Sequence, residues 1–252
     1  MYGNLRKICQ VNDTANRYME SSQHRYRMQL ETTPWFRGLS VELKDYLISH
    51  AKMLTLEKGQ FLYRRGEKSY GLYAVLGGAL SIGAIRADGK EALLAVLGPT
   101  AWVGEISMFD GLPRPNDVAA NTRALLLHIP ESALNKLLEE KPSYWRDFAL
   151  LMAQRLRLSF DNAEAMTMLP GPQRVANQLL TIAGGYGGLD AGHSTMRLSQ
   201  DSLASMVSLS RQTTNQILKN LESQRILSIK SGEIAILDFD RLRAASLGES
   251  GS

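Results

Sequence analysis

Hydrophobic positions change their spacing along the chain, and the changes separate it into parts. Between about residues 54 and 129, short apolar runs alternate with glycine-containing turns. Three of these turns fall at Lys58-Gly59, Arg65-Gly66 and Gly77-Gly78. Short strands with regular turn signals are typical of an all-β barrel or sandwich. Within this part, the stretch RADGKEA predicts a hairpin that turns at Asp88-Gly89.

A helix is expected just before these strands. Ser40 can cap it, because a serine hydroxyl accepts a free amide of the first turn. Leu43, Leu47 and Ile48 follow at helical spacing and form its apolar face. Farther upstream, the polar N-terminal residues contain a candidate helix around Asn16–Leu30.

A long helix is predicted from Pro142 to about Leu169, a stretch without glycine. Its apolar positions alternate by four and three residues, which is the spacing of a coiled-coil seam. Such a seam either pairs with a second copy, giving a homodimer, or packs on the chain's own β-domain. The polar seam residue Ser159 marks register or a bound group, since polar seam positions cost stability. The candidate dimer-interface residues are Ala149, Met152, Leu156, Ser159, Ala163 and Met166.

Two short helices joined by a tight turn are predicted near the C-terminus. Ser199 caps the first, and Ser210 caps the second, which spans about Arg211–Ser223. The second helix begins with polar residues and only then becomes apolar. One interpretation is a helix-turn-helix, whose second helix enters the DNA major groove by its N-terminal residues. The other is a helical hairpin with a polar surface.

Candidate DNA contacts gather at the start of this second helix. Arginine can donate two hydrogen bonds to guanine, and glutamine can pair with adenine in the same way. Arg211 is therefore the expected main base reader, while Ser199, Thr213 and Lys230 are expected at phosphates. The full set of candidates is Ser199, Ser210, Arg211, Gln212, Thr213, Asn215, Gln216 and Lys230.

These patterns predict four segments along the chain. They are an N-terminal extension (1–33), a β-domain (34–141), a long helix (142–169) and a C-terminal helical domain (170–252). A hinge is expected at LPGPQRV (Leu169–Val175), and a loop at GGYGGLDAGHST (Gly184–Thr195). Two short strands around Ser231-Gly232 are expected to form a wing.

Composition restricts the classes of protein to consider. The 252 residues are 44% hydrophobic, enough for two compact domains, and the net charge of +4 is compatible with nucleic acid. Cys9 is the single cysteine, which excludes an internal disulfide and a cysteine-only metal cluster. With neither a membrane span nor a secretory signal in the pattern, we expect a cytoplasmic protein.

In this order of parts, the sequence resembles the Crp/Fnr family of bacterial transcription regulators over about residues 35–240. SLASMVSLSRQTTNQILKNLESQRILSIKSGEIAIL matches the family's winged helix, with its Ser-Arg-x-Thr pattern and a glycine at the wing turn. GEISMFDGLPR, at Gly104–Arg114, is similar to the phosphate-binding cassette of cyclic-nucleotide domains.

The resemblance implies an α+β fold with three parts. These are an N-terminal cyclic-nucleotide-binding-like β-roll, a long dimerisation helix and a C-terminal winged helix-turn-helix. It also implies a homodimeric regulator that binds a pseudo-palindromic operator in double-stranded DNA and, if it activates, contacts RNA polymerase. The other interpretations are a nucleotide-independent regulator of the same family, or a regulatory module that acts through a protein partner.

The cassette contains side chains that can bind the ribose and the phosphate of a nucleotide. Glu105 can accept a hydrogen bond from a ribose hydroxyl, and Arg114 can neutralise a phosphate with two parallel donors. Two departures from the cyclic-AMP-binding pattern stand out, because Pro115 has no amide donor and Phe160 replaces a hydroxyl residue. The candidate effector-binding residues are Gly104, Glu105, Ile106, Ser107, Arg114, Pro115, Ser159 and Phe160.

The effector itself stays open at this point. Cyclic AMP, cyclic GMP, a cyclic dinucleotide, another small molecule or no ligand all fit the pattern. An iron–sulfur sensor needs four thiolates, which a chain with one cysteine cannot supply. No metal site and no enzyme are expected, since Gly-x-Ser-x-Gly, His-Glu-x-x-His and Walker motifs are absent from the sequence.

Overall fold

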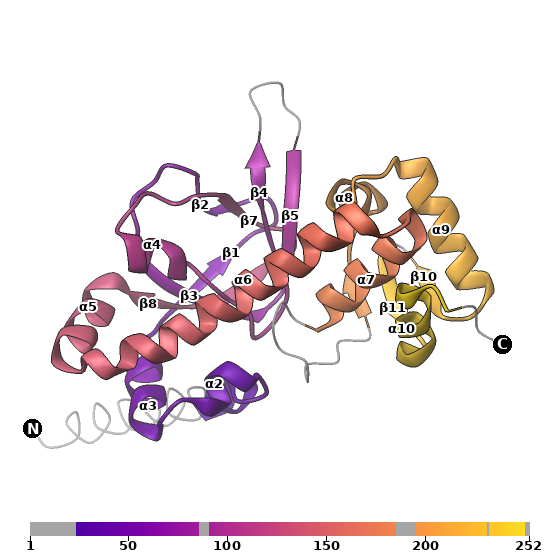
Figure 1. Cartoon of the computed structure of the whole chain (residues 1–252). Coiled ribbons are helices and arrows are strands. Elements are labelled where there is room, and N and C mark those ends of the chain that lie inside the picture. The colour runs from indigo at the N-terminus through magenta and orange to yellow at the C-terminus, as the bar shows by residue number, and fades with distance from the viewer. Residues whose placement is uncertain (1–23, 86–90, 185–194, 231, 250–252) are drawn as a thin grey trace, which may run out of the picture.

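The computed structural model describes residues 24–85, 91–184, 195–230 and 232–249 (Figure 1). Residues 24–30 are helical, and the rest of the candidate helix around Asn16–Leu30 lies outside the described residues. So do Cys9, the Asp88-Gly89 turn, and most of the predicted loop at Gly184–Thr195.

Two short helices precede the strands, α2 (Pro34–Gly38) and α3 (Val41–Ser49). The Ser40 hydroxyl accepts a hydrogen bond from the backbone N–H of Leu43 at 3.2 Å, which confirms the predicted cap. Leu43 and Leu47 are completely buried, so the predicted apolar face of this helix is confirmed as well.

In the described part of the chain, eight strands form the β-roll, in two antiparallel four-stranded sheets ordered β1-β8-β3-β6 and β2-β7-β4-β5. The strands are β1 (Lys52–Leu56), β2 (Phe61–Tyr63), β3 (Gly71–Gly77), β4 (Leu80–Ile85), β5 (Glu91–Leu97), β6 (Trp102–Val103), β7 (Asp117–Ala120) and β8 (Ala124–Pro130). Val75, Leu97 and Leu126 are fully buried in one core of this domain. The antiparallel pairing of β4 with β5 confirms the predicted hairpin.

Helices α4 (Glu105–Asp110) and α5 (Glu131–Glu140) belong to the β-roll, and α6 (Trp145–Met168) leads out of it. The long predicted helix is confirmed, except that a 3-10 turn occupies Pro142–Tyr144 before α6 begins. Figure 1 shows α6 running across the β-roll and on to the C-terminal domain. The Trp35 indole donates to the backbone carbonyl of Asp147 at 2.7 Å and ties α2 to α6.

The C-terminal domain is a winged helix. Its elements are α7 (Gly171–Ala183), β9 (Thr195–Arg197), α8 (Gln200–Met206), α9 (Arg211–Ser223), β10 (Leu227–Lys230), β11 (Glu233–Ile236) and α10 (Phe239–Leu247). Both predicted caps are confirmed, because Ser199 accepts from the N–H of Ser202 and Ser210 accepts from the N–H of Thr213, each at 3.0 Å. The predicted second helix, Arg211–Ser223, has the same bounds as α9.

Three details of this domain differ from the prediction. The hinge is shorter than Leu169–Val175, because α7 already begins at Gly171 and a proline in the first turn suits a helix start. The wing has a third strand, β9, which pairs with β11 although more than thirty residues separate the two strands in the sequence. A further helix, α10, follows the wing, and Asp238 caps its first turn by accepting from the N–H of Arg241 at 2.9 Å.

The two domains are packed on each other through β5. Val96 of this strand belongs to the same apolar cluster as Val175 of α7 and Met206 of α8. The backbone N–H of Leu93 also donates to the Ser205 hydroxyl at 3.4 Å. The winged helix is therefore docked on the β4–β5 hairpin as well as joined to α6.

The β-roll core generates a stability prediction. Leu126→Ala should lower the free energy of unfolding by about 2–5 kcal/mol, because it leaves a cavity among fully buried side chains. Met53→Ala is the control, since Met53 pairs with the neighbouring Leu127 but is 46% exposed. Denaturant unfolding followed by circular dichroism measures both. Equal losses of stability for the two variants would contradict this description of the core.

Candidate functional site

A cavity of about 630 Å³ lies between the β-roll and α6, within the size range of small-molecule sites. Its polar end is formed by the cassette between β6 and β7, and its other wall by α6. The lining residues are Tyr63, Ile82, Leu94, Ala95, Val103, Gly104, Glu105, Ile106, Ser107, Arg114, Pro115, Asn116, Ala149, Met152, Ala153, Arg155, Leu156, Leu158, Ser159 and Asn162.

Arg114 is the most buried charged side chain of this cavity, at 2% exposure. Its Nη1 donates to the carbonyl oxygen of Gly104 and its Nη2 to that of Gly71, each at 2.8 Å. The guanidinium carbon lies 4.3 Å from the centre of the Tyr63 ring, a cation–π distance. Among the described residues, no carboxylate forms an ion pair with Arg114. Its charge is held in place without being neutralised.

Gly104 makes this arrangement possible. Its φ is +108°, in the left-handed region that favours glycine. A Cβ atom there would lie 2.7 Å from the Gly71 carbonyl oxygen and 2.9 Å from Nη1 of Arg114. Helix α4 begins at the next residue, and the first amides of a helix have no partner within it.

Glu105 and Ser107, in the first turn of α4, are also buried, at 3% and 1% exposure. Among the described residues, the buried Ser107 hydroxyl has no hydrogen-bond partner, and Ser107 belongs to the cavity lining. Ile106, between them, is 42% exposed and lines the cavity.

Arg155 of α6 forms an ion pair with Glu105, with 3.1 Å between Nε and Oε1. The Nε–H is not aligned with the carboxylate, so the contact is ionic without a hydrogen bond. The sequence prediction missed Arg155. A signal was present, because Arg155 precedes Ser159 by four residues and so shares its helix face. The Ser159 hydroxyl donates to the Arg155 carbonyl oxygen at 3.0 Å.

The cavity carries a net positive charge. Burial raises the pKa of the Tyr63 phenol well above its usual value, although the nearby Arg114 charge opposes the shift, so this side chain stays neutral. The ionic side chains in the lining are Arg114, Arg155 and the single carboxylate Glu105. Their excess of one positive charge favours an anionic ligand.

Most of the predicted effector residues meet at this cavity. Gly104, Glu105, Ile106, Ser107, Arg114, Pro115 and Ser159 all line it. Phe160 does not belong to the lining, and its side chain is 65% exposed on α6. Asn116 and Asn162 add two amide side chains that the prediction did not include.

The predicted seam residues divide between the cavity and the surface. Ala149, Met152, Leu156 and Ser159 line the cavity, while Ala163 is exposed and Met166 packs against the winged-helix core. Leu156 is nevertheless 55% exposed, which leaves it and Phe160 as uncovered apolar side chains on α6.

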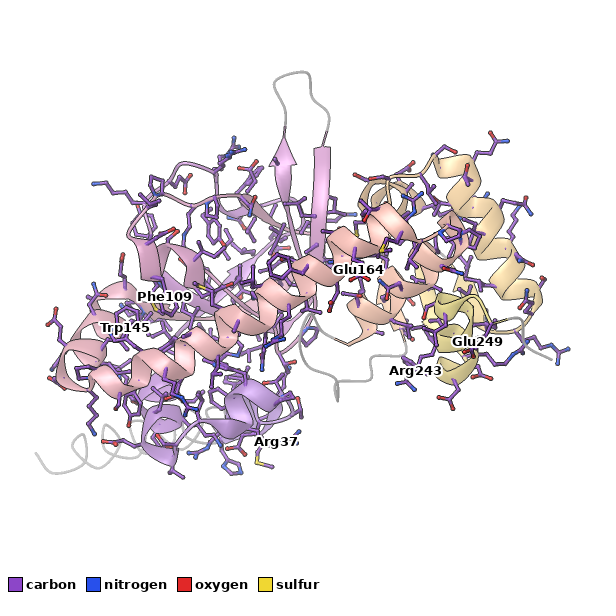
Figure 2. All side chains as sticks on the ribbon, in the orientation of Figure 1. Arg37, Phe109, Trp145, Glu164, Arg243 and Glu249 are labelled. Atoms are coloured by element: carbon purple, nitrogen blue, oxygen red, sulfur yellow. The ribbon has the colours of Figure 1, made fainter. Side chains whose placement is uncertain are left out.

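Aromatic contact links the cassette to the start of α6. Phe109 of α4 and Trp145 of α6 face each other, with their ring centres 5.1 Å apart (Figure 2). The cassette helix α4 is therefore in direct contact with the N-terminal end of α6, and the other end of α6 leads to the winged helix.

The predicted DNA-contact residues form an exposed polar end of the winged helix. Figure 1 shows α9 on the outer side of this domain, away from the β-roll. Arg211, Gln212, Thr213 and Gln216 are exposed, and Asn215 is half-buried. Thr214, in contrast, is fully buried and faces the domain core. Ser199 and Ser210 occupy the two caps, and Lys230 is exposed at the end of β10.

Comparison with known families identifies both domains. Residues 53–141 match the cyclic nucleotide-binding domain, and residues 173–245 match the Crp-like helix-turn-helix domain. The chain belongs to the Crp/Fnr family. As a member of this family, it is a DNA-binding transcription regulator, and the predicted α+β architecture is confirmed.

Two curated relatives of this Crp/Fnr protein align with it over almost the whole of their own length. The CRP-like cAMP-activated global transcriptional regulator of Mycobacterium tuberculosis is 28% identical over 209 residues, which cover 82% of this chain and 93% of the relative. The cyclic AMP receptor protein of Thermus thermophilus is 26% identical over 221 residues, covering 87% of this chain and 99% of the relative.

Solved structures share the fold. FixK2 from Bradyrhizobium japonicum superposes with a TM-score of 0.68 at 21% identity, covering 80% of this chain and 98% of FixK2. A CRP/FNR-family transcriptional regulator from Thermus thermophilus gives 0.61 at 22% identity, covering 79% of this chain and all of that one. In the described part of the Crp/Fnr chain, no helix has the length and apolar character of a membrane span.

Proposed function

We propose that this regulator is a cytoplasmic homodimer whose affinity for a pseudo-palindromic operator is set by a cyclic nucleotide in the cavity. The observation that carries the proposal is Arg114, a buried guanidinium at the wall of the cavity that has no ionic partner among the described residues. The protein acts by binding and not as an enzyme, and if it activates transcription it contacts RNA polymerase.

The cavity offers complementary groups for each part of such a ligand. The phosphate oxygens would accept hydrogen bonds from the remaining N–H groups of Arg114 and from the Ser107 hydroxyl. Glu105 would accept from a ribose hydroxyl, and Leu94 and Met152 provide apolar surface for a base. The relatives whose names include cyclic AMP support a cyclic nucleotide over other anions. Cyclic AMP, cyclic GMP and a cyclic dinucleotide are the ligands to compare.

A second copy of the chain is the proposed cover for α6. Leu156 and Phe160 lie one turn apart and are 55% and 65% exposed. The net charge of the C-terminal domain is small, so doubling the DNA-binding surface in a dimer gives operator affinity that one copy lacks. Because Leu156 also lines the cavity, the dimer interface and the ligand site share a helix face.

The ligand signal would travel along α6. This helix contributes Arg155 to the cavity, faces Phe109 of the cassette through Trp145, and continues into α7 after only Leu169 and Pro170. A nucleotide that binds one arrangement of α6 and α4 more tightly shifts the population towards it. That shift would change how the two recognition helices are spaced on DNA.

The alternative is a regulator of the same family that binds DNA without any nucleotide. Pro115 favours it, since the cassette lacks one amide donor there. Arg114 would then be a structural residue that ties β3 to the cassette. A regulatory module acting only through a protein partner is the less supported alternative, because α9 presents the polar face of a DNA reader.

The DNA-reading part of the proposal predicts distinct effects for two variants. Arg211→Ala should cost about 1–3 kcal/mol of operator binding and relax the preference at one base pair per half-site. Lys230→Ala should instead weaken binding to all sequences alike. It should also reduce, by about one, the steepness with which the logarithm of the binding constant falls with the logarithm of the salt concentration. Selection from randomised duplex DNA measures the preference. An unchanged motif for Arg211→Ala would remove this residue from the reading surface.

The dimer proposal predicts that Leu156→Asp gives a monomer. The change places two carboxylates face to face in an apolar interface, and even one unpaired buried charge is costly. The variant should also lose specific operator binding, because half of the contacts disappear. Lys136→Asp is the control, since Lys136 is exposed on α5. A dimer that persists in sedimentation of Leu156→Asp would rule out this interface.

The ligand proposal predicts that Arg114→Ala weakens nucleotide binding ten- to a hundredfold, the effect of losing a charged hydrogen-bond partner worth about 1.5–3 kcal/mol. Nucleotide-free DNA binding should stay measurable, because the recognition helix lies in the other domain. Calorimetry with each candidate nucleotide measures the effect, with the exposed Arg64 changed to Ala as the control. If Arg114→Ala binds nucleotide as tightly as the unchanged protein, the cassette is not the phosphate site.

A further inference from the structure

Two polar contacts join the N-terminal parts of α8 and α9 in the helix-turn-helix. Asp201, in the first turn of α8, forms an ion pair with Arg211 of α9, with 3.4 Å between Oδ2 and Nη1. Next to it, the Gln200 amide donates through Nε2 to the Asn215 amide oxygen at 3.3 Å. The first helix therefore holds two of the side chains that the second helix would present to DNA.

The ion pair is too exposed to hold the domain together. The side chains of Asp201 and Arg211 are 63% and 69% exposed, and such pairs have little effect on stability. Buried side chains pack the two helices instead, among them the fully buried Leu203 and Leu218. The main consequence of the pair is for the position of the Arg211 side chain.

The contact leaves Arg211 able to read a base. A guanidinium carries five N–H donors in a planar fork, and the contact with Asp201 involves one terminal nitrogen. Guanine requires two donors, for its O6 and N7 atoms. A long side chain that is already oriented loses less conformational freedom when it binds, so the pair favours the guanine contact.

The Asp201 carboxylate disfavours binding to DNA that lacks this guanine. A negative charge at the reading surface is repelled by phosphates and by the acceptor atoms that bases present in the major groove. On DNA with a guanine opposite Arg211, the Arg211–guanine hydrogen bonds offset the repulsion of Asp201. On DNA without that guanine, the repulsion is not offset. Built-in repulsion of the wrong partner is a general source of specificity.

We propose that Asp201 is a specificity-determining residue that positions Arg211 for guanine and penalises operators that lack it. The inference rests on the proposed role of Arg211 as the base reader. It assigns to α8 a part in sequence discrimination, although α9 is the helix that makes the base contacts.

The test uses the full-length protein, with and without saturating cyclic AMP. A motif is first selected from randomised duplex DNA, and affinities are then measured for that operator and for an unrelated duplex. Asp201→Asn should bind unrelated DNA more tightly without a matching gain for the operator. The ratio of the two affinities should fall by about fivefold or more, which corresponds to roughly 1 kcal/mol.

Asp240→Asn is the matched control. Asp240 also lies in the first turn of a helix, α10, and pairs with Arg243 at 3.0 Å, so the change removes the same charge from another helix start that carries an exposed ion pair. This control should keep the ratio of the unchanged protein. A ratio that Asp201→Asn also leaves unchanged would overturn the proposal.

A double variant shows whether Asp201 acts through Arg211. In an Arg211→Ala background, Asp201→Asn should no longer change the affinity ratio, because the coupled partner is gone. The same fall in that background would show a general charge effect and refute the positioning role. If Arg211→Ala itself leaves the selected motif unchanged, or no motif is selected, the proposed DNA reading fails and this inference fails with it. If Arg211→Ala changes the motif and Asp201→Asn does not change the ratio, only the role of Asp201 is refuted.

Discussion

The buried guanidinium of Arg114 constrains the architecture around it. A charge at 2% exposure is costly unless polar groups surround it, and here two carbonyl oxygens and the face of Tyr63 do so. The carbonyls belong to Gly71 and Gly104, whose positive φ angles bring the start of β3 and the cassette to the same point. The cavity thus has a fixed, positively charged end before any ligand arrives.

Helix α6 connects this charged end to the DNA-reading surface. It supplies Arg155 to the cassette, leaves Leu156 and Phe160 exposed, and passes into α7 through a break of two residues. The winged helix is held from a second side by β5, through Val96 and the Leu93–Ser205 hydrogen bond. The winged helix is therefore tied to the β-roll domain at two places, by the short linker after α6 and by its contacts with β5.

Local signals in the sequence predicted much of this structure. Ser40, Ser199 and Ser210 marked helix starts, because capping depends on neighbours a few residues away. The wing strand β9 and the Glu105–Arg155 pair were missed, since each joins residues far apart in the chain. Phe160 was expected at the ligand, but helix geometry turns it away from the cavity that Ser159 lines. The sequence names the residue types of a site, whereas the rotation of one helix decides which of them meet.

Control of DNA binding by a nucleotide requires that the cavity and the recognition helices be energetically coupled. Coupling is reciprocal, so operator DNA must change nucleotide affinity by the factor by which nucleotide changes operator affinity. The most direct measurement is calorimetry of the full-length protein with cyclic AMP, cyclic GMP and a cyclic dinucleotide, with and without saturating operator. The account predicts that one nucleotide binds and that its affinity differs about 5- to 150-fold between the two conditions. The same affinity with and without DNA, or no binding of any nucleotide, would contradict it.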